Sequence, residues 1–389
     1  MKFFKKKPLE KKAVSTPFLT TSSNYGYSGK EHTFEEMAAL GYQNNPIVYR
    51  CITLIARSIA SVQIHLKKKL SDTRITHHPI ISLLNNPNPF QRYESFTEMV
   101  VSHLLLSGNA FIEYVGDASS CGELYILRPD HVRILYTNQG FPETYEYQIG
   151  NTTHHIPIDG LTGRSQIVHI SLFNPFENHW GQSPLMAAMP LVQFRNEALD
   201  HNLSILKRGG NPSGVLTVDS QYEMTEEQRI QLRTDLENLY TGRDNAGRIM
   251  VLSNGLRWEK TGFSPQEMAF LEGQGEAARG IAQLFGIPPT CIGIPGDERF
   301  ANYKEARVHM WEETLIPMVN LILSNYQKLL SILDKEVELS YSKDDIDALS
   351  IKREALWERT NNAAFLTINE KRRIMGFTPL PDGDVLVAA

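Results

Sequence analysis

Cysteine is scarce in this sequence: Cys51, Cys121 and Cys291 are the only three in 389 residues. They lie far apart, form no C-x-x-C pair and are odd in number, which favours reduced thiols in a cytosolic compartment over a disulfide framework or metal site. Long apolar runs are also missing, because no segment approaches the roughly eighteen residues that a membrane-spanning helix needs. The lysines of residues 1–8 precede no apolar core, which argues against a secretory signal. We therefore expect no contact with a membrane.

Catalytic motifs are absent as well. Gly29-Lys30 is followed by Glu31 and lacks the preceding glycine of a phosphate-binding P-loop, so ATP hydrolysis is not expected. The segment 181–185 lacks the second glycine of a nucleophile elbow, and its Ser183 suits a helix N-cap better. The histidine pairs 77–78 and 154–155 have no metal-ligand spacing, and we interpret them as solvated. The sequence therefore predicts no catalytic residue, no metal site and no cofactor.

Acidic residues outnumber basic ones, and the net charge is −5. This balance argues against a protein that grips nucleic acid over its whole surface, although a local or transient contact with DNA remains possible. Asp344, Asp345 and Asp347 could be a two-metal carboxylate site, but the same residues suit a helix N-terminus, where the helix dipole favours negative charge. The chain is long enough for two or more domains with a sizeable core, since 41% of its residues are hydrophobic.

Two long helical patterns stand in the C-terminal half. The first begins at Ser264-Pro265, a capped and proline-first start, and is expected to end near Phe285 because Gly286 follows. Small residues recur along it at helical spacing, and they either let another backbone approach closely or are incidental: Gly273, Ala277 and Gly280.

The second pattern is a long amphipathic helix, predicted to start at Asn302 with Glu305 three residues later. Its apolar face consists of Val308, Trp311, Leu315, Val319, Ile322, Tyr326 and Leu330. Between the two helices, residues 286–301 are rich in glycine and proline and contain the charged run Asp297-Glu298-Arg299. Loops of this length inside a compact chain are usually functional or disordered. The helix pair could be a hinge or an ordinary helical hairpin.

Residues 1–32 lack apolar periodicity, and we interpret them as a mobile arm. The part that follows is predicted to be α+β, with helices followed by a mostly antiparallel meander. Helices are expected over 46–62, 79–86 and 95–107, the last opened by Ser95 with Glu98. Strands are expected over 64–66, 110–115, 123–127, 132–136, 145–149 and 167–170.

Another long helix is predicted from Ser183-Pro184, with Lys207 and Arg208 near its end and Pro190 expected to kink or tighten its first turns. A compact α/β insert follows, with strands over 215–218, 249–252 and 256–260 and a helix over 225–240. Thr225 and Gln228 are expected to form the capping box of that helix. Nearer the C-terminus, a strand is expected over 337–341 and helices over 356–365 and 368–374.

Several short segments occur in a specific order along the chain. They are Asn45–Ile52, His78-Pro79, Leu83–Asn88, Leu106–Phe111, Leu127–Asp130, Gly181–Leu185, Gly210–Gly214, Phe285–Pro289 and Leu366–Glu370. None is diagnostic by itself, but their joint order is highly specific. Through them the chain resembles the HK97-type portal proteins of tailed bacteriophages, a family that includes portals of prophages and gene transfer agents. The resemblance covers about residues 45–384.

The resemblance implies an α+β, multi-domain portal fold with a wing, two long stem helices, an α/β clip insert, a kinked helix with a tunnel loop, and a short helical crown. Its parts on this sequence would be a mobile N-terminal arm (1–32), a wing in two parts (33–182 and 304–349), stem helices (183–210 and 263–285), a clip (211–262), a tunnel loop (286–303) and a crown (350–389). The helix after the loop would brace it, and Pro317 fits a kink in that helix.

The resemblance also implies a function. Portal subunits form a ring, usually a dodecamer, at the capsid vertex around an axial channel for DNA packaging and ejection. The implied partners are further copies of the chain, double-stranded DNA without sequence preference, terminase, the major capsid protein and head-completion or adaptor proteins. The implied location is the virion, with host cytoplasm during assembly. A non-portal soluble scaffold or oligomeric adaptor without nucleic-acid contact is the alternative.

Two groups of residues become candidate sites through this resemblance. The DNA-channel loop would comprise Asp297, Glu298, Arg299, Phe300, Asn302, Tyr303 and Lys304. We expect its Arg299, Asn302 and Lys304 to touch passing phosphates while the two acidic residues limit adhesion, unless these charges face water or pair between subunits. The clip surface facing terminase or adaptors would comprise Glu226, Glu227, Arg229, Arg233, Asp235 and Glu237, which otherwise form a solvated helix face.

Overall fold

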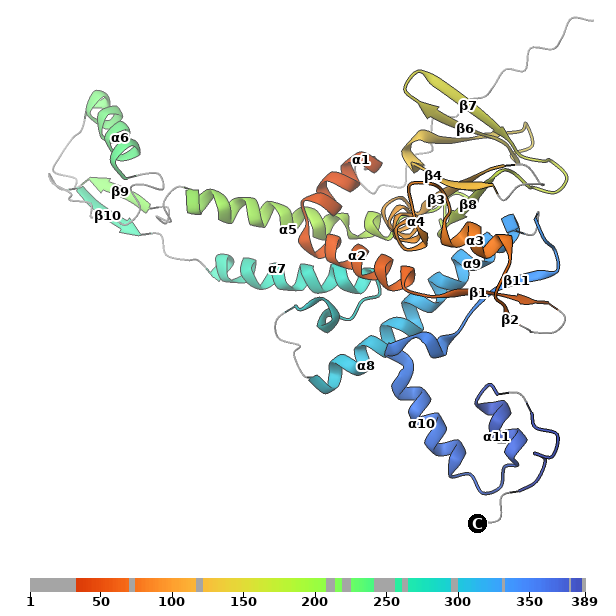
Figure 1. The fold of residues 1–389 in the computed structure, drawn as a ribbon. Helices are drawn as coiled ribbons and strands as arrows, with labels where there is room; N and C mark the ends of the chain where they lie inside the picture. The colour runs from red at the N-terminus through yellow and green to blue at the C-terminus, as the bar shows by residue number, and fades with distance from the viewer. Residues whose placement is uncertain are drawn as a thin grey trace, which may run out of the picture. The chain divides into compact units, whose positions relative to one another are not determined.

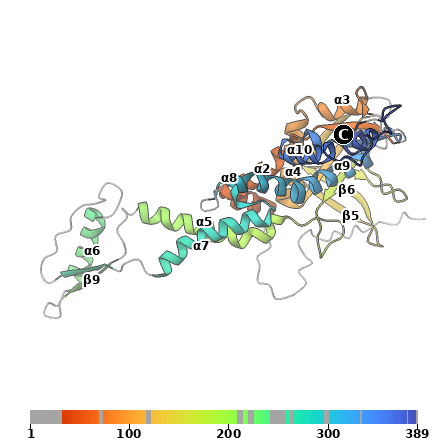
Figure 2. The same ribbon diagram turned by 90° about the horizontal axis from the view of Figure 1, so that it is seen from below.

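A computed structural model describes residues 33–69, 74–116, 122–207, 214–218, 225–240, 256–260, 265–294, 300–330, 333–377 and 379–386. The arm over 1–32, the strand over 249–252 and the charged run at 297–299 lie outside the described residues. The chain divides into two compact units, which are described separately below (Figure 1, Figure 2). The first comprises Met1–Phe34, Ile52–Ser183 and Gly286–Ala389, and the second Glu35–Cys51 and Pro184–Phe285.

The first unit holds antiparallel sheets of three strands each, in the orders β11-β1-β2, β4-β3-β8 and β5-β6-β7. Their strands are β1 (Ile64–Lys68), β2 (Arg74–Ile75), β3 (Asn109–Val115), β4 (Glu123–Leu127), β5 (Val132–Tyr136), β6 (Pro142–Ile149), β7 (Thr152–Pro157), β8 (Ile167–Ser171) and β11 (Val337–Tyr341). The predicted strands and their antiparallel pairing are confirmed. The prediction missed the two-residue strand β2. It also missed β7, because Ile156 is the only buried residue of this strand, which therefore shows no apolar alternation.

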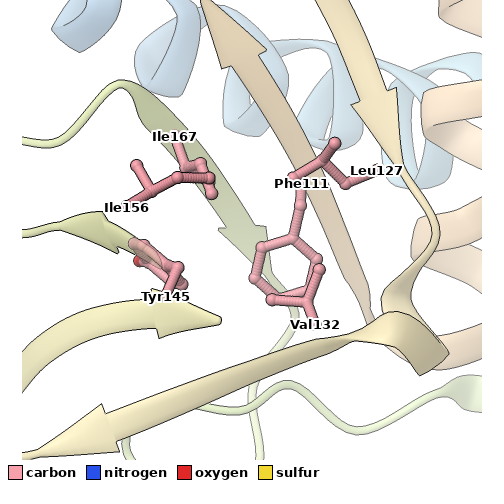
Figure 3. Close-up of a cluster of buried hydrophobic side chains, with 6 residues drawn as sticks. All are labelled: Phe111, Leu127, Val132, Tyr145, Ile156 and Ile167. Atoms are coloured by element: carbon pink, nitrogen blue, oxygen red, sulfur yellow. The ribbon is translucent and has the colours of Figure 1, made fainter. Parts of the chain in front are cut away.

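A cluster of buried side chains joins the two sheets that contain β3 and β6. Figure 3 shows its members pointing toward one another: Phe111, Leu127, Val132, Tyr145, Ile156 and Ile167. Phe111 is fully buried and stacks on the ring of His169 at a centroid distance of 4.3 Å. Aromatic pairs of this kind stabilise a core beyond the area they bury, so Phe111 is a central packing residue of the unit.

The helices α2 (Pro46–Ala60), α3 (Pro79–Asn85) and α4 (Tyr93–Ser107) are present where helices were predicted. The predicted start at Ser95 is wrong, because the helix already begins at Tyr93. The amide of Phe96 already donates to the carbonyl of Arg92, and the Ser95 hydroxyl donates to that same carbonyl instead of capping. Helix α4 ends as predicted at Gly108, whose φ of 77° is the left-handed conformation that glycine adopts most easily.

The bracing helix is a run of α8 (Phe300–Met310), a π-helical turn η5 (Trp311–Leu315) and α9 (Ile316–Leu330), visible as one rod in Figure 1. Every residue of its predicted apolar face is buried. The predicted start at Asn302 is wrong, because the helix already begins at Phe300. The irregularity expected at Pro317 takes the form of the π turn just before it, where the Ile316 amide donates to the carbonyl of Trp311. Proline has no N–H to continue the ordinary ladder, which favours such a wide turn.

The C-terminal part contains the 3₁₀ turns η6 (Lys343–Asp345) and η7 (Asp347–Leu349), then α10 (Ser350–Asn361) and α11 (Ile368–Ile374). The predicted helix over 356–365 is wrong in both bounds, because the consecutive polar residues Asn361 and Asn362 end α10 before Phe365 can join it. Helix α11 has the predicted capping box of Thr367 and Glu370.

The second unit is organised around α5 (Pro184–Lys207) and α7 (Pro265–Leu284), which lie side by side (Figure 1, Figure 2). The small-residue stripe of α7 faces α5. A Cβ at Gly280 would lie 2.8 Å from Cδ1 of Leu191, and a Cβ at Gly273 would lie 3.2 Å from Phe194. The stripe is therefore an interface within this unit, and the close approach is between the α7 backbone and α5 side chains.

The start of α2 is fixed to α5 by an asparagine pair. The Asn45 side-chain oxygen accepts hydrogen bonds from the amides of Ile47 and Val48, as an N-cap does. Its amide group donates to Asn196 of α5 at 3.0 Å, and Asn196 donates to the carbonyl of Leu40 in the π-helical segment η1 (Met37–Gln43). This segment follows the short helix α1 (Phe34–Glu36).

The insert contains β9 (Gly214–Val218), α6 (Glu226–Tyr240) and β10 (Leu256–Lys260), with β9 and β10 paired antiparallel. The predicted capping box is present: the Thr225 amide donates to Oε1 of Gln228 at 3.1 Å, and the Gln228 amide donates to Oγ1 of Thr225 at 3.4 Å. None of the described helices combines the length and apolar character that crossing a membrane requires.

Candidate functional site

The chain leaves the first unit for α5 at Ser183, and this exit is tightly held. The Asn109 side-chain oxygen accepts from the Gly181 amide at 2.7 Å and from His169 Nε2 at 2.9 Å, while its amide group donates to the Gly181 carbonyl. The Ser183 hydroxyl donates to the carbonyl of Leu105 at 2.7 Å. Two of the short segments recognised in the sequence, 106–111 and 181–185, therefore meet here.

The polar side chains at this exit, Asn109 and Ser183, are buried. Burial lowers the pKa of His169 to about 3, so the ring stays neutral at physiological pH and donates through Nε2 to Asn109. Gly181 and Gly108 approach so closely that a side chain on either would collide with the other segment's backbone. The backbone of the first unit is thus closely packed up to its exit at Ser183.

The chain returns to the first unit at Gly286, where the candidate loop begins. Gly286 has a φ of 67°, and a Cβ on it would collide with the hydroxyl of Thr314 in the π turn. The same hydroxyl donates to the Gly286 carbonyl at 2.7 Å. The base of the loop is therefore latched to the bracing helix by one side chain. No sequence pattern indicates this role of Thr314, because its position depends on the π turn.

The first half of the loop is anchored rather than free. Ile287, Cys291 and Ile294 are all buried. Cys291 belongs to the 3₁₀ turn η4 (Pro289–Ile292), and the other two residues flank this turn. Burial raises the pKa of the Cys291 thiol above its ordinary value, which keeps it protonated. The predicted loop over 286–303 is thus held at its start by a packed turn, and at its end it is shorter because α8 begins at Phe300.

The predicted loop residues are placed as follows. Asp297, Glu298 and Arg299 lie outside the described residues, and Phe300 and Asn302 are placed by the backbone only, in the first turn of α8. Tyr303 and Lys304 are both exposed on that helix.

Arg307 was missed by the sequence reasoning. It is exposed one turn after Lys304, and its charge acts on the thiol of Cys291. Its i, i+3 spacing from Lys304 was the available signal.

The predicted clip residues lie on α6. Glu226, Glu227, Arg229 and Arg233 are exposed, and Arg229 pairs with Glu226 at 3.2 Å. Asp235 and Glu237 are placed by the backbone alone, in the last turns of the same helix. Ile230 of this helix is 60% exposed, so the described half of α6 offers a mixed charged and apolar surface.

Among the histidines considered in the sequence, His77, His154 and His155 are exposed, as predicted, whereas His78 has a structural role. His78 is not simply solvated, because its Nδ1 accepts the Ile80 amide as the N-cap of α3, and its Nε2 lies 3.3 Å from Asp334. The turn containing Asp344 and Asp345 is capped by Ser342. No cluster of three or more potential metal ligands occurs among the residues that the structure describes.

The model of the family "Phage portal protein" matches residues 46–376. This chain belongs to the phage portal protein family. Its relatives include the portal protein of Enterobacteria phage HK97, 24% identical over 87% of this chain and 80% of its own, so the portal is of the HK97 type. An uncharacterized protein from Rickettsia bellii (strain RML369-C) is 37% identical over 89% of this chain and 90% of its own.

A solved structure agrees with this portal assignment. The structure described as the neck of a native gene transfer agent particle, computed with C12 symmetry, contains a chain with 32% sequence identity and a TM-score of 0.70. The match covers 89% of this chain and 94% of that one. The predicted α+β portal fold is confirmed, and so is the expectation that the chain is not an enzyme, because the family is structural.

The hydrogen bond from the Thr314 hydroxyl to the Gly286 carbonyl leads to a prediction about the start of the loop over residues 286–303. Replacing Thr314 with valine keeps the side-chain shape but removes the hydroxyl donor, which should cost about 1 kcal/mol. Hydrogen exchange over residues 286–294 should become faster in Thr314→Val, whereas Thr314→Ser, which keeps the donor, should stay near wild type. Equal exchange in all three proteins would show that the hydroxyl does not hold the loop.

Proposed function

We propose that this chain assembles into a ring, a dodecamer, at the vertex of a phage, prophage or gene transfer agent particle, where it forms the channel through which DNA is packaged and ejected. The observation that carries this proposal is the match over nearly the whole chain to a particle neck solved with C12 symmetry. The proposed partners are further copies of the chain, terminase, the major capsid protein and head-completion or adaptor proteins. Assembly would take place in the host cytoplasm before the ring enters the virion.

A ring of this kind needs head-to-tail contacts, in which one side of each copy meets a different side of the next. A channel for DNA also needs weak adhesion, since each Lys or Arg contact that releases counterions from a phosphate resists sliding. The net charge of −5 fits a conduit better than a protein that holds DNA in place.

The loop over residues 286–303 is the proposed contact with passing DNA. In support, its start is anchored by the buried Ile287, Cys291 and Ile294, and its end continues into the long bracing helix. In this proposal, Arg299, Asn302 and Lys304 touch phosphates, while Asp297 and Glu298 limit adhesion. Phe300 and Tyr303 would complete the channel-facing surface.

The exposed half of α6 is the proposed docking surface for terminase and later for adaptor proteins. Supporting this role, the helix carries charges of both signs: the acidic Glu226 and Glu227 are followed by the basic Arg229 and Arg233, and then by the acidic Asp235 and Glu237. Mixed charge of this kind favours specific pairing with a partner over general adhesion.

Electron microscopy of the purified full-length chain tests the ring. Rings with an axial hole are expected, because a shared interface repeated around an axis closes on itself. Mass photometry of the same sample should give one discrete mass that is a whole multiple of the 44.1 kDa chain. A stable monomer under every condition of salt and concentration would overturn the proposal.

Charge reversal in the loop tests the DNA contact. In particles assembled with Arg299→Glu or Lys304→Glu, the amount of DNA packaged and retained should fall several-fold, because each reversal replaces attraction to phosphate with repulsion. Arg164→Glu, in the exposed turn between β7 and β8, is the matched control and should package normally. Unchanged packaging and retention in both loop variants would remove these residues from the contact.

A further inference from the structure

Helix α8 carries opposite charges on opposite sides. Glu305 and Arg307 are two positions apart, which places them about 160° apart around an α-helix. Arg307 and Lys304, at i and i+3, share one side. Glu305 shares the other side with the pair formed by His309 and Glu313 at 3.1 Å.

These charges are not satisfied within the described part of the chain. Lys304, Glu305 and Arg307 are exposed, and none of them forms an ion pair with another described residue. The positive charge of Arg307 acts on the thiol of Cys291 in η4, where it partly offsets the effect of burial on the pKa of that thiol. Spacing on the helix also prevents Glu305 from reaching Arg307 of the same copy, because side chains at i and i+2 do not face each other.

A ring changes this situation. A twelvefold axis relates neighbouring copies by about 30°, so equivalent helices of adjacent copies lie at the same height and nearly the same inclination to the axis. In such a ring, a helix that lies along the boundary between copies presents opposite sides to its two neighbours. A helix that is basic on one side and acidic on the other is complementary to its own copy in this head-to-tail arrangement.

We propose that Arg307 of one copy pairs with Glu305 of the next copy, so that the α8 helices form a closed belt of ion pairs at the base of the loop. This inference rests on the proposed function, because it requires the ring. The partner is a second copy of this chain, selected by charge complementarity between the two sides of α8. A single exposed ion pair contributes little, but ring closure repeats the pair at every subunit boundary.

The belt would give the loops a shared support. Arg307 lies about two helical turns after the start of α8. Helix α8 contacts η4, the packed turn at the start of the loop. Pairing across the boundary would therefore fix both ends of each loop relative to its neighbour. Arginine suits this task because its planar guanidinium can bind a carboxylate through two parallel hydrogen bonds.

A charge-swap cycle on the full-length chain tests the proposal. Arg307→Glu and Glu305→Arg, each alone, place like charges at the boundary and should raise the protein concentration at which half of the chain is in rings at least tenfold. The double variant restores opposite charges in the reverse order and should return to within about threefold of wild type. Arg164→Glu is the control for a charge reversal elsewhere. Mass photometry at low salt measures the ring fraction.

The results distinguish a failure of the proposed function from a failure of the belt alone. Wild type without rings would overturn both the proposed function and the belt. Wild type and both single variants with equal ring fractions would overturn the belt alone. If Arg307→Glu fails to fold, as judged by circular dichroism, then Arg307→Gln takes its place. It should weaken the dependence of ring formation on salt, and an unchanged salt dependence would also overturn the belt.

Discussion

The contact between Gly286 and Thr314 is the constraint on which the candidate loop depends. The backbone at Gly286 adopts a positive φ, and the Thr314 hydroxyl occupies the space where a side chain would begin while it donates to the Gly286 carbonyl. That hydroxyl sits in a π turn, and the turn directly precedes a proline that cannot donate to the helix ladder. The position of Gly286, the first residue of the loop, thus follows from a local irregularity in the bracing helix.

The other passage between the units obeys the same logic with different chemistry. Asn109 uses its side-chain oxygen and amide group to hold Gly181, and Ser183 reaches back to Leu105. A buried amide with its hydrogen bonds made is stable, whereas one with a partner missing is costly, so this network fixes the backbone before α5 begins. In both places a glycine leaves room for a close contact, with backbone at Gly181 and with the Thr314 hydroxyl at Gly286.

Periodicity in the sequence was sufficient for most of the elements. The apolar face of the bracing helix, from Val308 to Leu330, is buried at every predicted position, because a long amphipathic pattern leaves few alternatives. Helix starts were less secure. Ser95 and Asn302 both have the chemistry of an N-cap, yet each lies inside a helix, because neighbouring residues already continue the ladder.

The candidate site was the part least accessible from the sequence. The small-residue stripe of α7 could be recognised from spacing, but its partner, the α5 side chains of Leu191 and Phe194, could not. Thr314 carried no motif, since its contact with Gly286 comes from the π turn. Long-range placement of this kind depends on tertiary packing, which local pattern does not encode.

The proposed function depends on shape and charge rather than on chemical catalysis. An acidic chain that exposes a few basic side chains on one helix can attract a phosphate backbone without holding it. A loop anchored at its start and braced at its end can approach DNA while its base stays fixed. These two properties together describe a guide for a moving polymer.

The most direct test of this account is the structure of the assembled ring by cryo-electron microscopy. The account predicts that the narrowest part of the axial channel is lined by residues 286–304 of every copy, with α8 directly behind them. A ring whose narrowest part is formed by another segment, with residues 286–304 away from the axis, would contradict it.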